Sequence, residues 1–167
     1  MVELHVEPAL HDKVMTHLRS PGSAEQAAFL FALRRPGTDI FDVVEETLMG
    51  RDDLAHQYND YLELTDQARV QLIKRAHALG ASLVEMHSHP FPLPATFSLA
   101  DRDGLRETVP HMWWRLANRP YFAIVVGPHD LDALAWLDNP NTPRPLDALV
   151  AGSARLTPTN NSLEGWW

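Results

Sequence analysis

The chain has 167 residues, 45% of them hydrophobic and 22% charged, which fits one globular domain that buries its own core. The formal net charge of −8 argues against a nucleic-acid partner. Cysteine is absent, which excludes disulfides, thiolate metal ligands and cysteine nucleophiles.

No targeting or membrane segment stands out. The first residues lack the basic region and the apolar stretch of a signal peptide. No run of about 18 apolar residues occurs, so we expect neither a membrane span nor a membrane partner. We therefore expect a cytoplasmic protein.

The first third of the chain alternates strand-like and helical patterns. A few strand-like residues precede apolar positions at helical spacing, which predicts a short strand and then a helix over residues 8–18. Residues 20–23, Ser-Pro-Gly-Ser, end this helix. Residues 24–33 are mostly apolar, and by periodicity they fit a buried helix or a buried strand. The next strand is expected over residues 41–48.

The middle of the chain carries the clearest helix pattern. Residues 49–59 are polar and contain Gly50, so we expect a loop with a short irregular piece. A helix is predicted between Thr65 as its N-cap and Gly80 as its C-cap signal. Its apolar face consists of Ala68, Leu72, Ile73, Ala76 and Leu79.

After Asp101 a helix is predicted to run to Val109, where Pro110 should interrupt it. Later strands are expected over residues 121–126, 133–137 and 146–150. We assign residues 1–155 to the domain and residues 156–167 to a C-terminal tail that is polar and mobile over residues 157–165. Trp166 and Trp167 then dock either on this domain or in a partner's groove. Strands interrupted by helices indicate an α/β or α+β layer fold.

The residues with the strongest chemical signal are His87-Ser88-His89-Pro90. On a strand, side chains two apart point to the same face, so His87 and His89 present two imidazoles together. Pro90 ends the strand. Ser98 has the character of a helix N-cap, which places Asp101 in the first helical turn, near the strand end. Two imidazoles and a carboxylate are a ligand set typical of catalytic zinc.

A His-x-His pair alone is a weak signal, because about half of shuffled chains with nine histidines contain one. The added serine, proline and Ser-x-x-Asp lower the chance to roughly one in ten thousand or less. The alternative is a His-rich turn beside an ordinary capping pair of Ser98 and Asp101, which leaves the paired histidines unexplained.

These residues resemble the JAMM motif of the JAB/MPN-domain zinc metalloproteases. The resemblance implies an MPN fold, which is cytidine-deaminase-like, with a curved mixed sheet flanked by helices. It implies one zinc ion bound by His87, His89 and Asp101, with Ser98 stabilising the oxyanion. The loop between His89 and Ser98 is one residue longer than the common form.

The resemblance also assigns residues 24–33 to a strand, with Glu25 at its head as the catalytic carboxylate. The family often has glycine three residues after this glutamate, and here Ala28 stands there. Without the resemblance, Glu25 reads equally well as a charged residue at the mouth of a strand. A base near a zinc-activated water requires such a carboxylate from elsewhere in the chain.

Other residues compete for a role. Glu85 shares the strand face of His87 and is expected to support a ligand or to line a substrate groove. Trp113 and Trp114 either line that groove, or one packs in the core while the other is partly exposed at the surface. Asp103 is a weaker rival to Asp101, and turn or surface positions are expected for His111 and His129.

By resemblance, the protein is a deubiquitinase-like zinc isopeptidase or peptidase, similar to stand-alone bacterial members. Its substrate would be a ubiquitin-like protein or its conjugates, cleaved after a C-terminal Gly-Gly tail. Its partners would include conjugation enzymes of the same operon, in a housekeeping or antiphage system. Two alternatives stay open: a non-catalytic MPN scaffold, and a zinc amidase for small molecules. A base deaminase would need cysteine ligands that this chain lacks.

Overall fold

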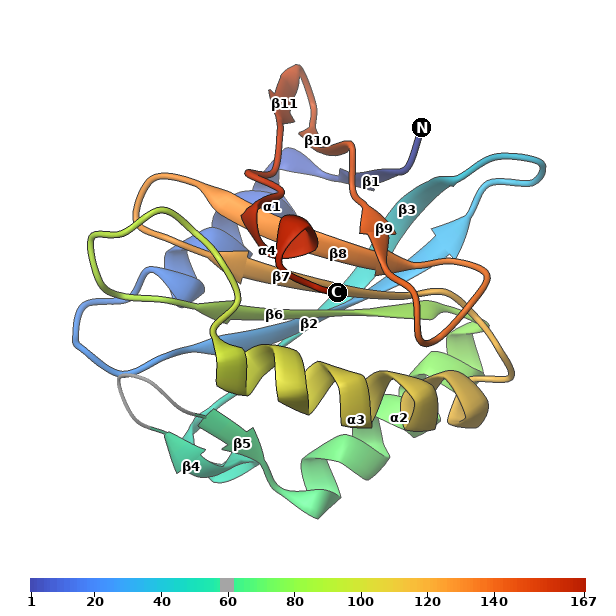
Figure 1. Ribbon diagram of the computed structural model, residues 1–167. Helices are drawn as coiled ribbons and strands as arrows, with labels where there is room; N and C mark the ends of the chain where they lie inside the picture. The colour runs from blue at the N-terminus through green and yellow to red at the C-terminus, as the bar shows by residue number, and fades with distance from the viewer. Residues whose placement is uncertain (58–61) are drawn as a thin grey trace.

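A curled nine-stranded sheet organises the protein, with the strand order β11-β10-β1-β3-β2-β6-β7-β8-β9 (Figure 1). The structure is a computed structural model that describes residues 1–57 and 62–167. The pairs β1–β10, β1–β3 and β6–β7 are parallel, and the other neighbours in this sheet are antiparallel. The fold is therefore a mixed α+β layer fold, as the pattern of elements predicts.

The strands of the sheet are β1 (Glu3–Val6), β2 (Ala27–Arg34), β3 (Ile40–Leu48), β6 (Ser82–Ser88), β7 (Tyr121–Val126), β8 (Leu131–Trp136), β9 (Arg144–Pro145), β10 (Ala148–Ala151) and β11 (Ala154–Leu156). A separate two-stranded ribbon is formed by β4 (Leu54–Gln57) and β5 (Leu62–Leu64). The helices are α1 (Pro8–Leu18), the 3-10 turn Arg51–Asp53, α2 (Asp66–Leu79), α3 (Leu99–Arg115) and α4 (Asn161–Glu164).

Helices cover both faces of the sheet and give it two apolar layers. Helix α1 contributes Val14 and Leu18 to the layer on one face. Helices α2 and α3 pack against the other face, below the sheet in Figure 1, through residues such as Leu72 and Val109. Strand β6 feeds both layers, because alternate side chains point to opposite faces. Among the described residues, no helix is both long enough and apolar enough to span a membrane.

Several elements form where the sequence predicts them. The helix over residues 8–18 and the strand near residues 41–48 are both present. In α2, the Thr65 side chain accepts a hydrogen bond from the Ala68 N–H, and Gly80 adopts the left-handed conformation with φ of 64°. The run 24–33 is a strand, β2, which begins two residues after Glu25.

Two predictions about irregular segments are wrong. The expected loop over 49–59 does contain a short irregular piece, the 3-10 turn, but strand β4 follows it, and residues 58 and 59 lie outside the described residues. Helix α3 continues through Pro110 to Arg115 instead of stopping at Val109. A proline inside a helix costs about 3 kcal/mol. Burial of Met112 and Trp113 beyond the proline offsets that cost.

The C-terminal tail is packed against the domain, so the expectation of mobility is wrong. The Ser162 N–H donates to the Asp132 carboxylate at 2.9 Å, and the Ser162 hydroxyl accepts from the Phe97 N–H at 2.7 Å. Trp166 is buried, with its ring centroid 5.7 Å from that of Trp136. Trp166 thus docks on this domain, while Trp167 remains exposed.

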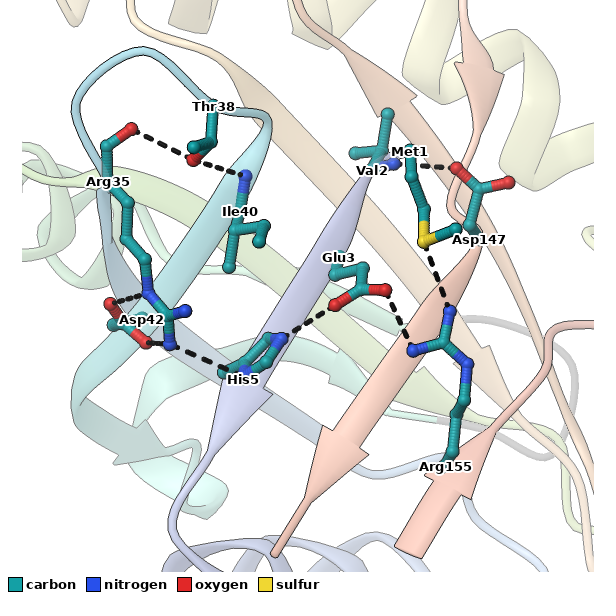
Figure 2. Close-up of polar contacts among 10 residues, drawn as sticks. All are labelled: Met1, Val2, Glu3, His5, Arg35, Thr38, Ile40, Asp42, Asp147 and Arg155. Atoms are coloured by element: carbon teal, nitrogen blue, oxygen red, sulfur yellow. Dashed lines mark hydrogen bonds and ion pairs between the residues drawn. The ribbon is translucent and has the colours of Figure 1, made fainter. Parts of the chain in front are cut away.

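A polar network joins the outer strands β1, β3 and β11 (Figure 2). The Glu3 carboxylate lies 2.7 Å from the His5 imidazole and 2.7 Å from the Arg155 guanidinium. Arg35 pairs with both oxygens of Asp42 at 2.7 Å and approaches His5 at 3.4 Å. The hydrogen bond from His5, followed by that from Arg155, lowers the pKa of Glu3.

We expect Glu3→Gln to lower the free energy of unfolding by about 1 kcal/mol at pH 7. A carboxylate with a lowered folded-state pKa stabilises above its unfolded pKa and loses that contribution as the pH falls through the folded value. The difference between wild type and variant should therefore shrink as the pH falls from 5 to 3. Urea unfolding at each pH measures it, with exposed Glu7→Gln as the control. An equal difference at both pH values would contradict the role of the Glu3 charge.

Candidate metal centre

Two imidazoles meet at the end of strand β6. His87 lies within the strand, and His89 follows one residue beyond its end. The His89 N–H donates to the Val126 carbonyl at 2.9 Å, which extends the pairing with β7 past the last residue of the strand. The two Nε2 atoms consequently lie 3.2 Å apart.

A carboxylate reaches the same point from the first turn of helix α3. Ser98 is the N-cap: its hydroxyl accepts from the Asp101 N–H at 3.1 Å, and its own N–H donates to Asp101 Oδ2 at 2.8 Å. Asp101 Oδ2 also lies 3.1 Å from His89 Nε2 and 3.4 Å from His87 Nε2. The capping box thus fixes the carboxylate that faces both imidazoles.

Glu25 completes the cluster from the segment before β2. Its side chain is almost fully buried, and Oε1 lies 3.5 Å from His89 Nε2. The neighbouring residue Gln26 is tied to Ser88 in both directions, because the Gln26 N–H donates to the Ser88 hydroxyl at 2.8 Å and the Gln26 carbonyl accepts from the Ser88 N–H at 2.9 Å. Gln57 of β4 donates to the Glu25 carbonyl at 2.9 Å.

The cluster favours charged forms in the protein without a metal. Burial raises the pKa of Asp101, but the hydrogen bonds from His87 and His89 outweigh it, so that the net shift is downward. Burial alone would lower the pKa of His87, yet the nearby Asp101 carboxylate raises it overall. His87 and Asp101 therefore stabilise each other's charged form.

The donor atoms fit the spacing that a tetrahedral zinc ion requires. Bonds of about 2.0–2.2 Å in tetrahedral geometry separate ligand atoms by about 3.3–3.6 Å. The three distances among His87 Nε2, His89 Nε2 and Asp101 Oδ2 are 3.2, 3.4 and 3.1 Å. Ligand atoms of Glu25, His87 and His89 also lie within 4.8 Å of one another and could hold a metal. The three edges of the Asp101 set lie within about 0.2 Å of the tetrahedral spacing, and Glu25 lies adjacent to this set.

The other candidate residues lie apart from this cluster. Asp103 is exposed and pairs with Arg106 at 3.0 Å. His111 and His129 are exposed. Trp113 is buried and Trp114 is 73% exposed, so the pair divides between core and surface, and neither lines the cavity beside the centre.

That cavity has a volume of about 420 Å³ and contains Glu85, as the strand alternation predicts. The Tyr121 hydroxyl of β7 donates a hydrogen bond to Glu85. Burial raises the pKa of Glu85, and the bond from Tyr121 partly opposes that shift. Tyr121 and Gln57 were not identified from the sequence, because the register of β6 with β7 and the presence of β4 have no local sequence signal.

Comparisons with known proteins bear on the fold. No protein-family model and no curated protein matches the chain. The solution structure of protein DSY2949 from Desulfitobacterium hafniense is similar, with a TM-score of 0.56 and 16% sequence identity. The match covers 90% of this chain and 94% of that one. This likeness supports the fold, while the chemistry of the centre has to be argued from its own side chains.

We expect Ser88→Ala to destabilise the metal-free protein by about 1 kcal/mol, since it removes the acceptor of the partly buried Gln26 N–H. Ser82→Ala on the same strand is the matched control. Ser82 is also buried, and within the described parts of the chain its side chain has no hydrogen bond. Urea unfolding measures both, and equal losses would mean that the Ser88–Gln26 bond contributes nothing specific.

Proposed function

We propose that the protein is a zinc-dependent peptidase or isopeptidase similar to the JAMM enzymes, with the MPN fold. The observation that supports the proposal is the triangle of His87, His89 and Asp101, whose edges lie within about 0.2 Å of the spacing around a tetrahedral zinc ion, beside the buried Glu25 carboxylate. Exposed acidic clusters are common without metals, but two imidazoles and two carboxylates in a mostly buried cluster form a donor set that suits a metal ion.

The departures from the family pattern have local support. The long loop between His89 and Ser98 is braced at its far end, where the Ala95 N–H donates to Asp130 at 3.0 Å and the Ala95 carbonyl accepts from the Thr159 hydroxyl at 2.9 Å. An extra residue in the loop is therefore compatible with a fixed Ser98. Ala28 lies within β2 and is fully buried, so this position is filled by the core.

The residues have separable roles in amide hydrolysis. His87, His89 and Asp101 would hold zinc, which when bound activates water and polarises the substrate carbonyl. Glu25 accepts a proton from the attacking water and passes it to the leaving amine. The Ser98 hydroxyl accepts from the Asp101 N–H and retains its own proton for the oxyanion. The C–N bond breaks, the water oxygen ends in the new carboxylate, and the amine leaves with the proton.

The substrate proposed from the resemblance is the C-terminal tail of a ubiquitin-like protein, in a conjugate or a precursor. A second candidate is a small-molecule amide, which the cavity of about 420 Å³ beside His87 favours because it could enclose such a ligand. Rates on a Gly-Gly-containing peptide and on an N-acyl amino acid separate the two, since only the amidase should favour the shorter compound.

Purified wild type should contain about one zinc per chain by plasma emission spectroscopy, and His87→Ala/His89→Ala should contain none, because two of three protein ligands are lost. Added zinc should raise the thermal midpoint of the wild type alone. Absence of zinc from both proteins, even after addition, would instead favour a non-catalytic scaffold.

Glu25→Gln should keep zinc at wild-type stoichiometry and lower kcat by about 10²–10⁴-fold, because the amide cannot accept the proton. A quenched fluorescent peptide with an internal Gly-Gly sequence measures the rate. Loss of zinc in this variant would make Glu25 a ligand. Full activity would remove it from catalysis.

A further inference from the structure

The cavity extends away from the metal centre along the face of the sheet. It begins at Glu25, His87 and Asp101 and continues between helices α2 and α3 and strand β5. Apolar side chains form much of its wall, namely Phe29, Leu62, Leu64, Leu72, Leu105 and Met112. Such walls suit the methylene stem of a side chain. A Gly-Gly tail has no side chain that could fill this space.

A carboxylate lies on the wall of this apolar cavity. Glu85 is two residues before His87 on β6, so both side chains point to the same face, about 6.6 Å apart along the strand. The Tyr121 hydroxyl donates a hydrogen bond to one of the two Glu85 oxygens. Throughout the described chain, no other group donates a hydrogen bond to Glu85, which leaves one oxygen for a ligand.

The charges around the cavity favour a cation. Glu63 and Glu107 line it in addition to Glu85, while Arg69 is the one lysine or arginine among its described lining residues. Glu25 and Asp101 are already committed to the metal centre. An anionic ligand would meet this acidic surface at a cost, and a cationic ligand would gain from it.

We propose that the cavity binds the side chain of a lysine or arginine that supplies the leaving amine, with Glu85 as the partner of its charge. This inference rests on the proposed peptidase function. Glycines on the acyl side carry no side chain, so a cavity of this width serves the other side of the scissile bond. The stems of lysine and arginine can span the distance from His87 to Glu85.

A cation-binding cavity distinguishes the two ways in which a lysine can be joined to a Gly-Gly tail. A lysine joined through its α-amine keeps a free charged side chain, which can enter the cavity. A lysine joined through its ε-amine has that nitrogen in the amide and brings no side-chain cation. The favoured substrate is therefore a Gly-Gly tail with a basic residue after it on a linear chain, as in a precursor extension.

Two isomeric peptides provide the test, one with Gly-Gly on the α-amine of lysine and one with Gly-Gly on the ε-amine. For the zinc-loaded wild type, kcat/KM should be at least 10-fold higher for the α-linked isomer, and also higher for α-linked arginine than for α-linked glutamine. Glu85→Gln should remove the preference for lysine and arginine over glutamine. Glu7→Gln, the same change at an exposed position, should keep it.

The zinc content and the thermal midpoint of Glu85→Gln check that the variant folds. Preference for the ε-linked isomer, or a basic preference that survives in Glu85→Gln, would overturn the cavity assignment while leaving the peptidase intact. If zinc-loaded protein cleaves none of the peptides, the proposed function fails. Calorimetry with arginine amide then tests cation binding in the cavity independently of catalysis. Binding to the wild type that is lost in Glu85→Gln would support the cavity assignment, and no binding to the wild type would overturn it.

Discussion

The antiparallel pairing of β2 with β6 is the constraint on which the centre depends. Its register sets Ala27 opposite His87 and is continued by the two hydrogen bonds between Gln26 and Ser88. The chain before β2 therefore has to pass beside the strand end that carries the imidazoles. Glu25, in the connection that leads into β2, thus reaches histidines more than 60 positions away in sequence.

The start of helix α3 fixes the other part of the centre, the Asp101 carboxylate. A carboxylate in the first turn of a helix is favoured by the helix dipole and by the unpaired N–H groups there. Asp101 is held in this position by the reciprocal bonds with Ser98. The capping pair and the ligand assignment are therefore compatible, although they appear as alternatives in the sequence. The bonds that cap the helix also orient the oxygen that faces both imidazoles.

How far the sequence predicts the protein depends on the range of the interaction. Local signals suffice for α2, whose cap residues Thr65 and Gly80 act within one turn, and for the pairing of His87 with His89 by strand alternation. At Pro110 the local prediction of a helix end fails, because tertiary packing of the buried face stabilises the helix beyond the proline. The prediction of a mobile C-terminal tail fails for the same reason, because the tail is fixed by contacts with distant residues such as Asp132. The placement of Glu25 needed the family resemblance.

The two faces of strand β6 have different roles in the proposed mechanism. On one face Ser88 bonds to Gln26 and fixes the neighbouring strand. On the other face Glu85 and His87 are two residues apart, so a cation bound at Glu85 would lie at a set distance from the bond that we propose is cleaved. A shift of one residue in the pairing would exchange the two faces and remove both functions together. The register of a single strand pair thus determines where hydrolysis would occur and which leaving group would be accepted.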